Sequence, residues 1–95
     1  MKKYEVMFIL KTTLEEESRV ALINKFKGIV EADGEIEKIE EWGNKKLAYE
    51  INKTSEGYYV LMNIKSSIEV PTELDRNFKI SEDVMRHMIV NVEEK

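Results

Sequence analysis

Apolar and polar residues follow two periodicities along this chain, which together divide it into six segments. Alternation with a period of two predicts four strands. These strands cover residues 3–10, 35–51, 58–65 and 84–92. The second strand changes its period near Trp42-Gly43-Asn44, which predicts a bulge or bend there. A turn is expected over residues 52–57.

Two segments have the spacing of helices. After the first strand, apolar residues recur in one helical stripe that comprises Leu22, Phe26, Ile29 and Val30. Thr13 and Glu16 have the spacing of a capping box, so this helix is expected to begin at Thr13. A second, shorter helix is expected with Pro71 in its first turn and with Leu74 and Phe78 as its apolar anchors.

The order β-α-β-β-α-β restricts the topology of the sheet. Right-handed crossovers place one strand between the first and second strands, and likewise between the third and fourth. The hairpin between the second and third strands then fixes the strand order as 4-1-3-2. We therefore predict one α+β domain over residues 1–95 with a ferredoxin-like fold, in which both helices cover one face of a four-stranded antiparallel sheet.

The other face of this sheet is expected to be bare. The more apolar rows should lie under the helices, and they are Tyr4, Val6, Phe8, Leu10, Tyr58, Val60, Met62 and Ile64. This leaves uncovered, on the two central strands, Met7, Ile9, Tyr59 and Leu61. A buried guanidinium needs a charged partner, so Arg86 is placed on the bare side with Met88, while His87 leans inward. Such a patch is typical of a partner surface, although scattered exposed apolar residues are also normal.

The second strand lies at an edge of the predicted sheet and carries mixed charges. These charged residues are Glu37, Glu40, Glu41, Lys45 and Lys46. Mixed charges keep an edge from pairing with copies of itself, and they can also form an ionic docking strip around Trp42. Trp42 itself is either a clamp over the end of the sheet or an interface anchor.

Composition and charge narrow the partners of such a domain. Charged residues make up 36% of the chain, well above the usual ~25%. Acidic residues outnumber basic ones by 19 to 15, for a net charge of −4. Positive charge gathers in residues 1–13 and 42–53, each of net charge +2. Any contact with a polyanion should therefore be small and local.

Several kinds of chemistry have no support in the sequence. The chain has no cysteine, which excludes disulfides and thiolate nucleophiles and fits a reducing cytoplasm. No apolar run reaches the ~18 residues of a membrane span, and no phosphate-binding glycine motif occurs. His87 is the only histidine and is expected to be structural, so we predict no catalytic site, metal or cofactor.

Three other functions are found on this architecture. RNA-recognition domains place aromatic residues on the third strand after a basic residue and a glycine. Here the segment opens with Glu56 and has Val60 at the second aromatic position, so stacking of single-stranded RNA across the sheet is not expected. A regulatory metabolite-binding module would need a glycine-rich loop after the first strand, and an acyl-phosphate hydrolase would need an arginine there. Lys11-Thr12-Thr13-Leu14 offers neither.

Four segments carry a more specific signal. The first is Met1-Lys2-Lys3-Tyr4-Glu5, and the most specific is Glu41-Trp42-Gly43-Asn44-Lys45-Lys46-Leu47-Ala48-Tyr49 followed by Ile51-Asn52-Lys53. Residues 57–63 and 84–90 complete the pattern. On these segments the chain resembles, over essentially its whole length, the bacterial small-subunit ribosomal protein six family.

This resemblance implies a non-catalytic assembly scaffold of the cytoplasmic ribosome. It implies binding to the central domain of small-subunit ribosomal RNA together with ribosomal protein eighteen, as a heterodimer, with no cofactor, small-molecule substrate or membrane partner. The phosphate-facing candidates are Lys2, Lys3, Lys53 and Arg86. The candidates for the interface with the partner protein are Glu40, Glu41, Trp42, Lys45, Lys46 and Tyr59.

Overall fold

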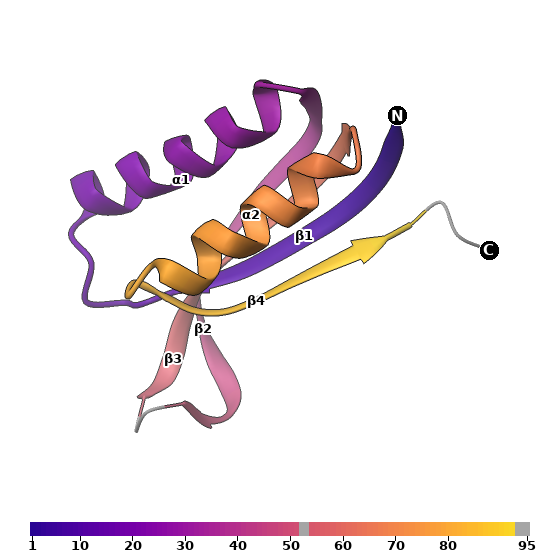
Figure 1. Ribbon diagram of the computed structural model, residues 1–95. Helices are drawn as coiled ribbons and strands as arrows, with labels where there is room; N and C mark the ends of the chain where they lie inside the picture. Colours follow the sequence, from indigo (N-terminus) through magenta and orange to yellow (C-terminus); the bar gives the residue numbers. More distant parts are fainter. Residues whose placement is uncertain (52–53, 93–95) are drawn as a thin grey trace.

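The computed structural model describes residues 1–51 and 54–92, and for residues 45–51 and 54–55 it describes the backbone alone. The strands are β1 (Lys2–Leu10), β2 (Gly34–Ile51), β3 (Thr54–Ser66) and β4 (Val84–Asn91). The helices are α1 (Glu16–Glu31) and α2 (Glu69–Ile80). Neighbouring strands are antiparallel in the order β2-β3-β1-β4, and both helices lie on one side of the sheet (Figure 1). The predicted fold and strand order are confirmed.

The hydrophobic core lies between the two helices and the sheet. The alternation in β1 and β3 turns every second residue toward the helices, and the central ones, among them Val6, Phe8 and Met62, are fully buried. Phe8 meets Phe26 of α1 and Phe78 of α2, with ring centroids 4.6–5.2 Å apart in the three pairs. Three aromatic rings from three elements therefore join both helices to the sheet.

The first helix begins later than predicted. α1 begins at Glu16, its N-cap residue is Glu15, and no side chain caps it by a hydrogen bond. The expected capping box at Thr13 is therefore wrong. Between β1 and α1 the backbone forms a turn, in which the amide of Leu14 donates to the carbonyl of Lys11 at 3.5 Å. Leu14 also packs against the core. In the second helix, Pro71 does lie in the first turn, as expected.

The β2–β3 hairpin combines a confirmed prediction with a wrong one. The register of β2 shifts between Glu41 and Gly43, where Gly43 has φ +80°, and this confirms the predicted bulge. The turn expected over residues 52–57 is wrong for residues 54–57, because β3 already begins at Thr54. The rest of that turn, residues 52–53, lies outside the described residues. The longer ladder carries the hairpin beyond the rest of the sheet (Figure 1).

Neither α1 nor α2, the helices within the described part of the chain, is long and apolar enough to cross a bilayer.

Candidate macromolecular interface

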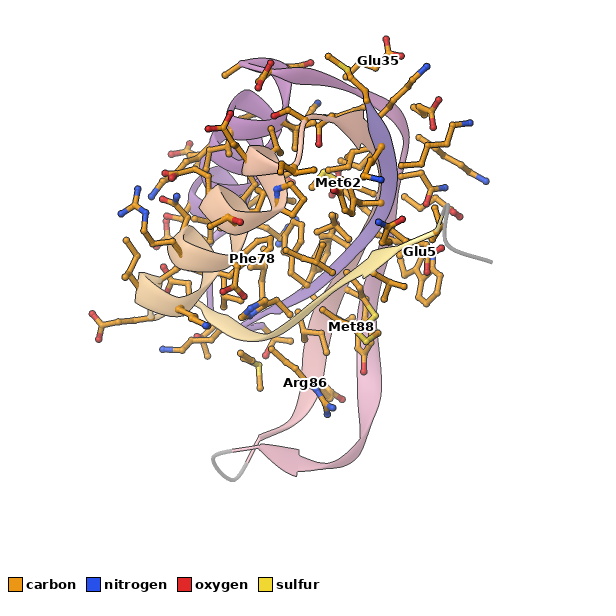
Figure 2. The ribbon with its side chains drawn as sticks, turned by 45° about the vertical axis from the view of Figure 1, so that its right-hand side comes forward. Glu5, Glu35, Met62, Phe78, Arg86 and Met88 are labelled. Atoms are coloured by element: carbon orange, nitrogen blue, oxygen red, sulfur yellow. The ribbon has the colours of Figure 1, made fainter. Side chains whose placement is uncertain are left out.

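The face of the sheet away from the helices is built from rows of side chains that cross all four strands. Directly opposite residues of antiparallel strands point to the same face, so the pairing register gives the rows. From β2 to β4 they are Gly43–Tyr59–Ile9–Arg86, Glu40–Leu61–Met7–Met88 and Lys38–Asn63–Glu5–Val90. Figure 2 shows Glu5, Met88 and Arg86 on this side, while Met62 and Phe78 lie between sheet and helices. We call this surface the open face.

An aromatic pair occupies the β2 end of the open face. The bulge at Gly43 places the indole of Trp42 parallel to the ring of Tyr59, with centroids 6.4 Å apart and 14° between the planes. Trp42 remains 47% exposed, so it covers its neighbour and still offers a surface to a partner. The stacking on Tyr59 fits the interpretation of Trp42 as a clamp, and its role as an interface anchor stays a prediction.

One residue expected on the open face is not accessible there. Ile9 is only 2% exposed, although its side chain belongs to the uncovered row. In the register it lies between Tyr59 and Arg86, and Trp42 stacks on Tyr59. Ile9 is therefore flanked in its row by the larger side chains of Tyr59 and Arg86.

The two acidic residues beside Trp42 face opposite sides of the sheet. Glu40 lies on the open face opposite Leu61 and forms a solvent-exposed ion pair with Lys38 at 3.5 Å. Glu41 lies opposite Val60, whose side chain is buried on the helix side. The structure therefore separates this predicted pair, and only Glu40 shares a face with the aromatic residues.

Glu41 takes part in a polar cluster that sequence reasoning missed. Its carboxylate accepts a hydrogen bond of 2.7 Å from the hydroxyl of Tyr58, and this bond is the main cause of the raised pKa of Tyr58. The guanidinium of Arg19 in α1 lies 4.3 Å from the centroid of the Tyr58 ring. No local pattern links Arg19 with a residue on β3, so only the folded structure brings them together.

The predicted phosphate-facing residues lie at separate places. Lys3 is on the open face and approaches Glu37 to 3.9 Å, and Lys2 is exposed at the beginning of β1. Arg86 is exposed on β4, opposite Ile9. Six residues of extended strand separate the Lys3 and Ile9 positions, which corresponds to roughly 20 Å. Lys2 and Lys3 are thus neighbours at the beginning of β1 but point to opposite faces of the sheet, whereas Arg86 stands at the other end of the sheet.

Two further candidate lysines, Lys45 and Lys46, lie on the β2–β3 hairpin. The backbones of Lys45 and Lys46 pair with Gly57 and Glu56 in the β2–β3 ladder. Their side chains, and the whole of Lys53, lie outside the described residues.

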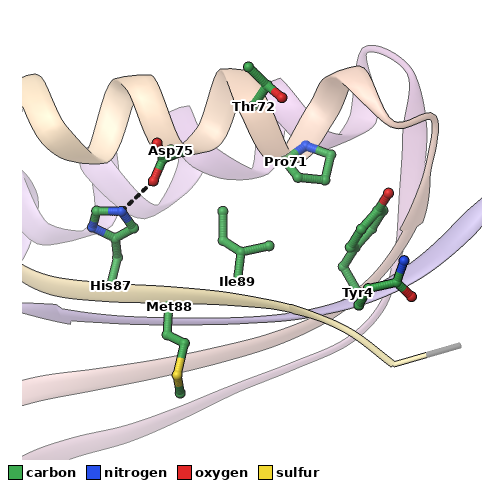
Figure 3. Close-up of a pocket in the computed structure, with 8 residues that line it drawn as sticks. Tyr4, Pro71, Thr72, Asp75, His87, Met88 and Ile89 are labelled. Carbon is green, nitrogen blue, oxygen red and sulfur yellow. Dashed lines mark hydrogen bonds and ion pairs between the residues drawn. The ribbon is translucent and has the colours of Figure 1, made fainter. Parts of the chain in front are cut away.

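A groove of about 460 Å³ opens on the helix side, between α2 and β4. The imidazole of His87 lies 2.7 Å from the carboxylate of Asp75 (Figure 3). Lys79 approaches the second carboxylate oxygen of Asp75 to 2.9 Å. Hydrogen bonds from Lys79 and then His87 hold the pKa of Asp75 below its usual value. These contacts join α2 to β4, so His87 has a structural environment, and no group of three potential metal ligands converges within the described residues.

The fold and the open face together define a class of protein. It is an α+β domain with one sheet face packed under helices and the other presented as a flat, partly apolar surface with charged residues at its rim. Such a surface fits a macromolecule better than a small ligand, because it offers area and alternating charge rather than an enclosed cavity.

Comparison with known proteins identifies the family. Residues 3–91 match the family model described as ribosomal protein S6. The chain is 62% identical to small ribosomal subunit protein bS6 of Alkaliphilus metalliredigens over 94 residues, which cover 99% of this chain and 100% of the relative. It is 54% identical to bS6 of Clostridioides difficile over 90 residues, which cover 95% of this chain and 98% of that protein.

A solved structure agrees with these relatives. The crystal structure of 30S ribosomal protein S6 from Thermotoga maritima superimposes with a TM-score of 0.89 at 32% sequence identity, covering 95% of this chain and 86% of that one. The chain belongs to the ribosomal protein S6 family (bS6). It is a non-enzymatic, structural protein of the small ribosomal subunit and takes part in translation. The resemblance found in the sequence is confirmed.

Proposed function

We propose that this chain binds the central domain of small-subunit ribosomal RNA together with ribosomal protein eighteen, as a heterodimer in the cytoplasmic ribosome, and that it acts there as an assembly scaffold. The observation that carries this proposal is the composition of the open face. Its middle is apolar, at Leu61, Met7 and Met88, and its β2 side holds an exposed indole beside the carboxylate of Glu40.

The net charge of −4 is the reason why this chain needs a partner to bind RNA. A chain with this charge is a weak RNA ligand by itself, because affinity for RNA depends on neutralising phosphates. A cationic partner protein supplies the missing phosphate contacts, and the carboxylates at the rim of the open face attract it. Trp42 and Tyr59 then provide the aromatic contact area that typically dominates the energy of an interface.

A smaller part of the RNA contact is assigned to this chain. Lys2, Lys3 and Arg86 are exposed, and each can meet one phosphate. Lys53, which lies outside the described residues, completes this set. Lys45 and Lys46, on the same hairpin as Trp42, are assigned to the partner together with Glu40. Glu41 contributes indirectly in this arrangement, because its carboxylate is bound to Tyr58 on the other side of the sheet.

Binding to central-domain RNA with and without the partner tests the proposal. We expect filter retention of the RNA at low protein concentration only when ribosomal protein eighteen is present. Trp42→Ala should weaken binding of the partner by about tenfold or more, since truncation of an aromatic anchor costs roughly 2 kcal/mol. Ile80→Ala is the matched control, because Ile80 is an exposed apolar residue on the helix layer.

Two results would contradict this proposal. Tight binding of the RNA by this chain alone would remove the need for a cationic partner. Equal partner affinity of the wild type and the Trp42→Ala variant would remove the open face from the interface.

A further inference from the structure

Two methionines lie side by side in the apolar middle row of the open face, one on the central strand β1 and one on the edge strand β4. Met88 of β4 lies directly opposite Met7 of β1, and Met7 in turn lies opposite Leu61 of β3. Met88 is 51% exposed, whereas Met7 is partly buried. Figure 3 shows the side chain of Met88 directed away from α2, opposite to His87 and Ile89. Its thioether therefore lies on the surface proposed to receive the partner.

The other methionines of the described residues have different environments. Met62 is fully buried in the core, and Met85 is partly buried at the beginning of β4. Met1 is exposed but stands at the other end of the molecule, beside Asp33 and Lys65. Met88 alone combines an exposed side chain with a place in the apolar middle row of the open face, within the part of the chain that the structure describes.

We propose that Met88 is a site of reversible oxidation by peroxides, and that its sulfoxide weakens docking of the partner on the open face. This inference rests on the proposed function. The sulfur of Met88 attacks one peroxide oxygen and forms an S–O bond while the O–O bond breaks. The thioether loses two electrons and becomes a sulfoxide, and hydrogen peroxide is reduced to water. A methionine sulfoxide reductase reverses the change with two thiols, which become a disulfide while the oxygen leaves as water.

The neighbours of Met88 explain why its oxidation should matter. In the complex, the side chain would be enclosed by the partner and by its apolar neighbours on the open face, Met7 and Val90. A thioether fits such surroundings because it is polarisable and weakly polar. A sulfoxide oxygen is a strong hydrogen-bond acceptor, and its burial without a donor is unfavourable. The free chain can carry the sulfoxide at little cost, because Met88 is exposed there.

Exposure also confines the reaction to one state of the protein. Peroxide reaches the sulfur of Met88 in the unassembled chain, whereas the docked partner covers it. The unassembled pool would therefore be sensitive to oxidation, and the assembled subunit would be protected.

The experiment combines residue-resolved oxidation with measurement of partner affinity. The full-length protein is treated with hydrogen peroxide, and peptide mass spectrometry gives the oxidation rate of each methionine. We expect Met88 to react at least tenfold faster than Met62, and its rate to fall several-fold when the partner is bound. Affinity for ribosomal protein eighteen should drop about tenfold or more after oxidation and return after treatment with the reductase.

Two variants assign the effect to one sulfur. Met88→Leu should lose less than twofold of its own starting affinity after peroxide, although Met1 still oxidises. Met85→Leu should lose affinity as the wild type does. An unchanged midpoint of urea unfolding after oxidation excludes general damage to the fold as the cause.

The outcomes separate this inference from the proposed function. If the untreated protein does not bind the partner, the proposed function fails and the inference fails with it. If the untreated protein binds and the protein oxidised at Met88 binds equally well, only the inference is overturned. Slow oxidation of Met88, at the rate of the buried Met62, also overturns it.

Discussion

Two glycines with opposite surroundings show where this fold needs a residue without a side chain and where it does not. A Cβ atom at Gly34 would stand 2.5 Å from both the carbonyl oxygen of Lys65 and the Cβ of Ser66, where β2 begins against β3. A Cβ atom at Gly28, inside α1, would meet nothing within 4 Å. Gly34 permits the close approach of two strands. Gly28 has no such role and only makes α1 more flexible than alanine would.

Alanine at these positions should therefore act in opposite directions. Gly34→Ala is expected to lower the free energy of unfolding by about 1–3 kcal/mol, because backbone must move to admit the methyl group. Gly28→Ala is expected to raise it by about 0.5–1 kcal/mol, because alanine loses less entropy in a helix. Urea unfolding followed by circular dichroism measures both, and equal signs for the two variants would contradict the explanation.

Tyr58 gives a second prediction at the scale of one residue. The hydrogen bond to Glu41 is the main cause of its raised pKa, and Arg19 acts in the opposite direction. Glu41→Ala should thus lower the pKa of Tyr58, and Arg19→Ala should raise it further. Nuclear magnetic resonance titration of ¹³C-labelled tyrosine rings resolves Tyr58 from the other tyrosines. Shifts of the same sign in both variants would refute the assigned causes.

The sign of the linked effect on stability follows from the same shift. A tyrosine whose pKa is higher in the folded than in the unfolded chain stabilises the fold fully below the unfolded value, near pH 10. This contribution is lost as the pH rises through the folded pKa. Glu41→Ala should accordingly make the free energy of unfolding less dependent on pH in that alkaline range.

At the scale of elements, the aromatic rings of Phe8, Phe26 and Phe78 hold the two helices on the sheet. Phe78→Ala should lower the free energy of unfolding by about 3–5 kcal/mol, because it leaves a cavity where α2 meets β1 and removes three ring contacts, with Phe8, Phe26 and His87. Ile80→Ala on the exposed side of the same helix should change it by less than about 0.5 kcal/mol. Urea unfolding curves test the pair, and similar losses for both variants would rule out this packing.

The elements themselves could be predicted from sequence wherever the signal is local. The alternation in β1 and β3 depends only on neighbouring residues, so these strands and their buried rows followed from it. The strand order then followed from the order of the elements and the right-handed crossovers. The beginning of α1 could not be predicted in the same way, because Thr13 had the right spacing for a cap while the backbone turn at Lys11 and the packing of Leu14 decided the matter.

The candidate site was harder to predict, since its contacts join distant parts of the chain. The sequence indicated a bulge beside Trp42, but not that this bulge would bring the indole onto Tyr59 or that Ile9 would be buried. It placed Glu40 and Glu41 together because they are adjacent, whereas the pairing register turns them to opposite faces. The period of two already indicates this separation, because adjacent residues of a strand point to opposite faces, but the register shifts on either side hide which face each residue takes.

For the whole molecule, the distribution of charge leads to a prediction about RNA binding. Each phosphate contact that is lost should reduce the slope of log K against log salt concentration by about one. Arg86→Ala, measured in the complex of this chain with ribosomal protein eighteen on central-domain RNA, should show a reduction of this size. Arg76→Ala is the control, because Arg76 lies on α2 and pairs with Glu73. Identical slopes for the wild type and Arg86→Ala would remove Arg86 from the phosphate contacts.

The position of β1 in the middle of the sheet determines how early during synthesis the sheet can be completed. Tyr4 pairs with Ile64 on one side and with Asn91 on the other, so both neighbours of the earliest strand are made long after it. At about 5–20 residues per second, roughly 4–17 seconds of synthesis separate Tyr4 from Asn91. A nascent chain therefore leaves the exit tunnel with its central strand still lacking a neighbour, and the sheet closes only when β4 has emerged. A component of the translation machinery thus reaches its own native state only after β4 has been translated.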